Sequence, residues 1–203
     1  WTETDGGAHQ ADYQDPIAQE RKRNGEKGSH GPKGPAFEYP DVDDYAYNDG
    51  KITQKALKKM KQLKSEEKPF FMAIGYVSPH LPFIQPKKYW DMYKHDKVPL
   101  AENTYQPKNS PYIAMHAQHD SAELRNMYLD IPSEGLLNEE MSRNLVHGYY
   151  ASVSYMDVLI GELINGLDEL GLRENTTIIL WSDHGFFLGE HGFWCKHLSL
   201  IHI

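Results

Sequence analysis

The sequence has 203 residues, of which 39% are hydrophobic and 25% are charged, and its formal net charge is −8. A negative chain lacks the excess of lysine and arginine that neutralises phosphates, so nucleic acid is not an expected partner. No apolar run reaches the length of a membrane span, and the single cysteine, Cys195, cannot form an internal disulfide. The chain is long enough to bury one sizeable core.

Residues 1–48 are rich in glycine, proline and charge, and we expect them to form an irregular surface segment ahead of the main part of the domain, residues 49–203. A helix is expected to begin at a cap formed by Asn48 or Asp49 and to end near Lys64. Its apolar positions recur every three or four residues, with lysines on the opposite face.

Two short apolar runs predict buried strands. Residues 70–77 follow Pro69 and are continuously apolar, and residues 176–181 consist of two threonines followed by four apolar residues. The prolines from Pro79 onward predict a long loop region that reaches about Leu137.

A long helix is expected between these two runs. Asn138 can cap it, Glu139 and Glu140 suit its first turn, and Gly171 suits its end. Its apolar stripe consists of Leu145, Tyr149, Val153, Met156, Ile160, Leu163, Leu167 and Leu170. The alternation of helices and strands predicts an α/β fold with a largely parallel central sheet flanked by helices.

Reactive side chains follow both expected strands, where ligands bind in open α/β sheets. The first strand leads to His80, and the second leads to Asp183 and His184 and then to Lys196. Taken singly, each residue has an ordinary structural interpretation: a turn former, a surface imidazole or a solvated lysine. Glu190 and His191, in the glycine-rich stretch between them, could serve only to hydrogen-bond the loop.

Taken together and in order, these strings resemble the sulfatase family, and most of all the iduronate-2-sulfatase type and its bacterial relatives. The strings that carry the resemblance are Lys68-Pro69-Phe70-Phe71, Pro79-His80-Leu81-Pro82-Phe83, the helical stretch 149–157, Ser182-Asp183-His184-Gly185 and the stretch from Leu188 to Lys196. The resemblance implies an alkaline-phosphatase-like domain that hydrolyses sulfuric esters of sugars.

The resemblance also implies a set of roles. The metal would be Ca²⁺, held by Asp183 and His184; a carboxylate suits this hard cation, and an imidazole suits it less well. His80 and Lys196 would contact the sulfate and stabilise charge during catalysis. The nucleophile of the family is a formylglycine, whose hydrated aldehyde attacks sulfur.

One part of the family pattern is absent. Formylglycine is made from Cys or Ser in a Cys/Ser-x-Pro-x-Arg string, and no such string occurs in this sequence. We therefore expect the nucleophile upstream of Trp1 and expect the 203 residues alone to be inactive. The tail, residues 198–203, matches nothing in the family. The family implies a periplasmic or secreted location in bacteria and a lysosomal one in animals.

Three other interpretations remain open. A phosphodiesterase or phosphatase of the same superfamily would also place Asp-His after a strand, but it usually has more metal ligands. A structural zinc site could use His184, His191, Cys195 and His197, although their spacing fits no common finger. A carbohydrate-binding module could use aromatic side chains such as Tyr89, Trp90 and Tyr93.

Overall fold

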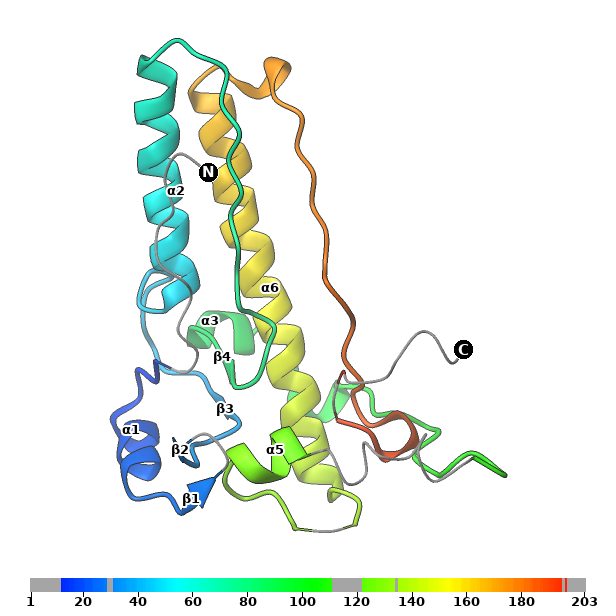
Figure 1. Ribbon diagram of the computed structural model, residues 1–203. Helices are drawn as coiled ribbons and strands as arrows, with labels where there is room; N and C mark the ends of the chain where they lie inside the picture. The colour runs from blue at the N-terminus through cyan, green and yellow to red at the C-terminus, as the bar shows by residue number, and fades with distance from the viewer. Residues whose placement is uncertain (1–11, 29–30, 111–121, 134, 195, 197–203) are drawn as a thin grey trace.

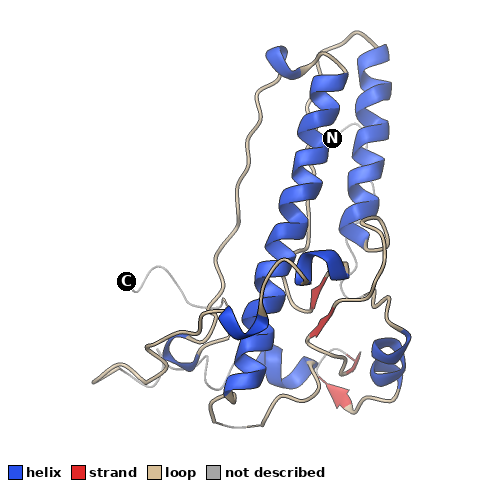
Figure 2. Ribbon diagram, turned by 180° about the vertical axis from the view of Figure 1, so that it is seen from behind, coloured by secondary structure: helices blue, strands red, loops and turns tan. Residues whose placement is uncertain are grey.

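The computed structural model describes residues 12–28, 31–110, 122–133, 135–194 and 196. Two long helices, α2 (Asn48–Ser65) and α6 (Glu139–Glu169), run side by side (Figures 1 and 2). Most of the shorter elements gather around the N-terminal half of α6 (Figure 1). Among the described residues, none of the helices combines the length and the apolar character that a membrane span requires.

Helix α6 confirms the prediction made from its sequence signals. The Asn138 side chain accepts a hydrogen bond from the backbone N–H of Met141, at 2.8 Å, and so satisfies one of the unpaired donors of the first turn. Glu139 and Glu140 occupy that turn, where negatively charged carboxylates interact favourably with the positive end of the helix dipole. The chain leaves the helix at Gly171, whose φ of 63° favours glycine.

Helix α2 lies where the periodicity predicts it, but its predicted cap is wrong. The N-cap residue is Tyr47, which makes no side-chain capping bond, and Asp49 lies inside the first turn with 4% of its surface exposed. The Asp49 carboxylate accepts hydrogen bonds from the backbone of Val77 and Ser78 instead. Helix α2 packs closely on α6: a Cβ atom added at Gly166 of α6 would lie only 2.5 Å from the side chain of Leu57 in α2.

The N-terminal segment is more regular than expected. Helix α1 (Pro16–Arg23) is capped by Asp15, whose side chain accepts from the N–H of Ile17. Strands β1 (Lys27–Gly28) and β2 (Gly31–Pro32) pair antiparallel. Strand β3 (Phe37–Glu38) pairs parallel with β4 (Phe83–Ile84). The first eleven residues lie outside the described part.

The two strands predicted from apolar runs are not strands here. Residues 70–77 and 176–181 are extended, but within the described residues they form no β-ladder. Their apolar side chains are correspondingly uncovered: Phe71 is 79% exposed, Ile179 78% and Trp181 86%. An apolar run sets strand propensity, but a strand also needs a neighbour for its N–H and C=O groups. The fold has helices and small sheets, and parallel pairing in the described part is limited to β3 with β4 and an isolated bridge between Gly34 and Tyr128.

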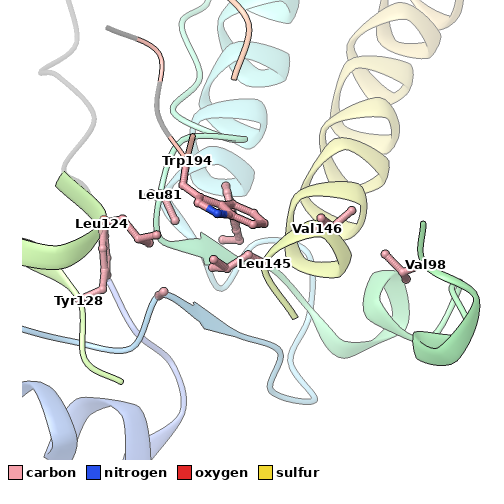
Figure 3. Packing of buried hydrophobic residues seen from close by; sticks show 9 residues of the cluster. Leu81, Val98, Leu124, Tyr128, Leu145, Val146 and Trp194 are labelled. Atoms are coloured by element: carbon pink, nitrogen blue, oxygen red, sulfur yellow. The ribbon is translucent and has the colours of Figure 1, made fainter. Parts of the chain in front are cut away.

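The main hydrophobic cluster joins segments that lie far apart in sequence. It contains Leu81 just before β4, Val98 after the 3-10 helix η1 (His95–Lys97), Leu124 and Tyr128 at helix α5 (Ala122–Met127), Leu145 and Val146 of α6, and Trp194 near the C-terminus. Figure 3 shows these side chains converging on the N-terminal half of α6. The cluster fixes the loops that border α6 to one another.

A second cluster surrounds the middle of α6 and includes Tyr89 and Trp90 of helix α3 (Lys87–Trp90). Next to it lies His147, which is 1% exposed. Its Nε2–H donates to the backbone carbonyl of Trp90 at 2.8 Å, and its ring stacks on the Trp90 ring with centroids 3.7 Å apart. Nδ1 has no hydrogen-bond partner among the described residues.

The burial of His147 predicts that the folded protein loses stability in acid. Desolvation lowers the pKa of His147 below its ordinary value of 6.5, while nearby His95 lowers it further and the Trp90 carbonyl and Asp91 oppose the shift. The unfolded chain therefore takes up a proton before the folded chain does, and stability is lost as pH falls from about 6.5 toward the folded-state pKa. Denaturant titrations from about pH 5 to about pH 8 should give a steeper decline for the wild type than for His147→Phe. Equal slopes would contradict this.

Candidate active site

His80 and Lys196 are 116 residues apart in sequence and meet in the structure, where Lys196 Nζ contacts His80 Nε2. On the other side of the imidazole, His80 Nδ1 lies 2.7 Å from the backbone carbonyl oxygen of Leu81. A carbonyl oxygen can only accept a hydrogen bond and a lysine ammonium can only donate one. The geometry therefore assigns the ring proton of a neutral His80 to Nδ1 and makes Nε2 the atom that faces Lys196.

The neighbours of these two residues explain why they meet. Leu81, next to His80, is 1% exposed, and Trp194, two positions before Lys196, is 5% exposed. Both side chains belong to the main hydrophobic cluster, on the same side of α6 (Figure 3). Burying both side chains in one cluster brings the two polar residues to the same edge of the core.

Asp183 and His184 form a second pair, which follows the extended residues 176–181 in sequence. His184 Nε2 lies 3.2 Å from Asp183 Oδ2, and the two side chains are 43% and 83% exposed. The backbone N–H of His184 donates to Asp183 Oδ1 at 2.9 Å, and His184 Nδ1 lies 2.9 Å from the carbonyl oxygen of Gly185. Exposed oxygens of this kind are accessible to a cation.

The metal-binding capacity of the described residues is limited. They contain no group of three or more His, Cys, Asp or Glu side chains arranged to hold a metal ion. The Asp183 carboxylate fits a calcium ion as one hard oxygen ligand, but calcium takes about six to eight oxygens. Asp183 and His184 can therefore supply only part of such a site.

The glycine-rich stretch 185–192, which lies between His184 and Lys196 in sequence, contains hydrogen bonds that hold its own loop. Glu190 accepts from the N–H of Leu188 at 2.7 Å, within the turn that contains the 3-10 helix η4 (Glu190–Gly192). His191 donates through its backbone N–H to the carbonyl of Asn103 at 2.7 Å, and its Nδ1 lies 3.0 Å from the carbonyl of Tyr105. This agrees with the interpretation of Glu190 and His191 as loop-bonding residues.

The structure opposes one of the alternative interpretations, the carbohydrate-binding module, and leaves the zinc site untested. Tyr89 and Trp90 are 1% and 8% exposed, so they cannot form a platform on which a sugar stacks. The zinc site stays untested, because Cys195 and His197 lie outside the described residues; of its other two residues, His191 has its Nδ1 3.0 Å from the carbonyl of Tyr105 and His184 has its Nδ1 2.9 Å from the carbonyl of Gly185.

Comparison with solved structures gives the class of fold. The chain superposes on a phosphonate monoester hydrolase from Silicibacter pomeroyi with a TM-score of 0.58, over 90% of this chain and 35% of that one, at 22% sequence identity. The chain therefore shares the fold of the corresponding part of that hydrolase.

Comparison of sequences gives the family. The Sulfatase family model matches residues 4–200, and the chain therefore belongs to the sulfatase family. The match includes residues 198–200, so the expectation that the whole tail 198–203 matches nothing in the family is wrong for its first three residues. It is 35% identical to iduronate 2-sulfatase from Mus musculus over 160 residues, which cover 77% of this chain and 29% of that protein. A sulfatase from Formosa agariphila is 30% identical over 138 residues, 66% of this chain and 25% of that protein. The chain thus spans between a quarter and a third of the length of these relatives.

Proposed function

We propose that the polypeptide containing this chain hydrolyses sulfate esters, and that His80 and Lys196 bind the sulfate. The contact between Lys196 Nζ and His80 Nε2 carries the proposal, because it brings together two nitrogen groups that are 116 residues apart in sequence. Membership of the sulfatase family and the likeness to iduronate 2-sulfatases support the same activity.

The chemistry follows from the donors that each group has. A lysine ammonium has three N–H donors, which suits it to bridge an imidazole and a sulfate oxygen. Cleavage of the ester places negative charge on the leaving oxygen, and cationic or donor groups held nearby stabilise that charge more in the transition state than in the bound substrate. The Leu81 carbonyl keeps the His80 proton on Nδ1, so His80 would donate through Nε2 only after gaining a second proton.

Calcium and formylglycine are the groups that the family brings to this reaction. Asp183 would bind the calcium ion through a carboxylate oxygen, with His184 beside it, and further ligands would come from outside these 203 residues. The ion would supply positive charge at the sulfate, and the formylglycine would supply the attacking oxygen. No Cys/Ser-x-Pro-x-Arg string occurs in the sequence, so the nucleophile also belongs outside it.

The proposed substrate is a sulfated carbohydrate. The relatives named iduronate 2-sulfatase make a uronate 2-sulfate the first candidate, and other sulfated polysaccharides follow. The proposed compartment is that of the family: periplasmic or secreted in bacteria, lysosomal in animals. The fold and the pair His80–Lys196 do not discriminate among sugars, because sugar selectivity depends on loops around the sulfate.

The proposal is tested by comparing two purified proteins. We expect the complete polypeptide, with its formylglycine formed, to release sulfate from para-nitrophenyl sulfate. The 203-residue chain alone is expected to release none, since a sulfatase needs an activated nucleophile in line with the leaving oxygen. Sulfate release by the short chain would overturn the assignment of the nucleophile, and inactivity of the complete, modified polypeptide on all sulfate esters would overturn the function.

A further inference from the structure

The first turn of α2 faces the end of the extended segment that leads to His80. Asp49 lies in this turn, and its carboxylate accepts two hydrogen bonds from successive backbone groups. Oδ1 accepts from the N–H of Val77 at 3.0 Å, and Oδ2 accepts from the N–H of Ser78 at 2.9 Å. Both carboxylate oxygens are therefore directed at the chain two to three residues before His80, and the side chain is buried.

A second contact from α2 holds the same segment. Thr53, one turn further along the helix and fully buried, has its hydroxyl 2.8 Å from the hydroxyl of Tyr76. Residues 70–77 form no β-ladder with other described residues, so these side-chain contacts replace the ladder as attachments of the segment. Bonds to a carboxylate are stronger than those between neutral groups, which makes Asp49 the main attachment.

Val77 and His80 are held together by a backbone hydrogen bond, so the position of Val77 affects the position of His80. The backbone N–H of His80 donates to the carbonyl of Val77 at 2.9 Å, which closes a tight turn over Ser78 and Pro79. Asp49 thus fixes the first residue of the turn, and His80 is its last residue. Beyond the turn, Leu81 enters the core and the His80 ring meets Lys196.

We propose that Asp49 is a positioning residue of the sulfate-binding site, which acts by fixing the turn 77–80 so that His80 reaches Lys196. This inference rests on the proposed function, since it assumes that His80 binds the sulfate. Asp49 itself would not contact the substrate, because both of its carboxylate oxygens accept hydrogen bonds from backbone N–H groups. The signal in the sequence was a carboxylate at the start of a helix, and it was open to interpretation as an ordinary cap.

The variant that tests this is Asp49→Asn in the complete polypeptide. The amide keeps the shape of the carboxylate but replaces one acceptor oxygen with a donor, which opposes one of the two backbone N–H groups. We expect kcat on para-nitrophenyl sulfate to fall on the order of 10-fold to 100-fold, since a displacement of about 1 Å at a reacting group can cost about 10²-fold. KM should change less, because the loss falls on the transition state.

A double-mutant cycle with His80→Ala separates positioning from general weakening of the fold. If Asp49 acts through His80, Asp49→Asn should lower kcat by less than about 2-fold in the His80→Ala background. A merely structural residue would lower kcat by the same factor in both backgrounds, and that result would overturn the inference. If Asp49→Asn does not fold, Asp49→Glu, which keeps the carboxylate on a longer side chain, takes its place in the cycle.

The matched control is Asp44→Asn, the same change at another shielded carboxylate near the start of α2. Asp44 accepts from the Tyr89 hydroxyl at 2.9 Å and pairs with Lys88, with 14% of its side chain exposed. Its kcat should stay within about 2-fold of wild type. Loss of activity in His80→Ala with none in Asp49→Asn would refute the positioning role and leave the proposed function intact. Full activity in His80→Ala would refute both.

Discussion

Replacing Lys196 with alanine in the complete polypeptide is expected to lower kcat on an aryl sulfate by on the order of 10²-fold or more, the effect of losing a single oxyanion-stabilising donor. KM should rise by a smaller factor, because the charge that Lys196 meets grows as the ester bond breaks. The same expectation holds for His80→Ala. Steady-state kinetics with para-nitrophenyl sulfate give both constants.

Lys97→Ala is the matched control for this experiment. The Lys97 side chain is 75% exposed and pairs only weakly with its neighbour Asp96, so its removal should leave both constants unchanged within about 2-fold. Turnover close to wild type in Lys196→Ala would mean that the contact with His80 is structural. A rise in KM with an unchanged kcat would instead mean that Lys196 contributes equally to substrate and transition state.

Replacing Asp183 with alanine is expected to weaken calcium binding by about 100-fold or more, since loss of even a supporting residue around a metal costs about 10- to 100-fold. The carboxylate is a charged oxygen ligand of the kind that calcium prefers, and alanine offers nothing in its place. Calorimetric titration of the metal-free complete polypeptide with calcium measures the affinity. His184→Ala should have a smaller effect, because an imidazole nitrogen is a poorer calcium ligand.

Asp168→Ala controls for the loss of a negative charge. Asp168 lies near the end of α6 with 55% of its side chain exposed, and its carboxylate is 4.0 Å from Arg173. Its removal should leave the calcium affinity unchanged. Equal affinity of the wild type and Asp183→Ala would show that the carboxylate after residues 176–181 is not a ligand.

The two long helices, α2 and α6, could be predicted from the sequence because their determinants are local, whereas the short helices α1, α3 and α5 were not. The cap at Asn138, the apolar stripe and the stop at Gly171 all lie within α6 or beside it, and each confirmed the others. The sheet could not be predicted in the same way. Residues 70–77 have strand propensity without a ladder, whereas Phe37–Glu38 pairs with Phe83–Ile84 although it lies in a segment rich in glycine and proline. Pairing depends on which distant segment lies alongside, and propensity does not encode that.

For the candidate site, the sequence indicated which residues belong to it but not how they come into contact. The order of short strings along the sequence singled out His80, Asp183, His184 and Lys196, and their roles stay predictions. The contact of His80 with Lys196 depends on the burial of Leu81 and Trp194 in one cluster, which no local pattern indicates. Asp49 was misread for a related reason: the rule for helix caps considers only the helix that follows, and the carboxylate bonds a segment about 28 residues away in sequence.

The exposure of residues 176–181 also leads to an expectation about the chain in concentrated solution. Between Glu174 and Asp183 no residue carries a charge, and the Ile179, Leu180 and Trp181 side chains are each more than two thirds exposed. An extended apolar ribbon with open hydrogen-bonding edges is a template for pairing with the same ribbon of another molecule, since no charged side chain or proline interrupts it. Self-association of the 203-residue chain is therefore expected to begin at this ribbon, and a lysine introduced there would act as a gatekeeper against it.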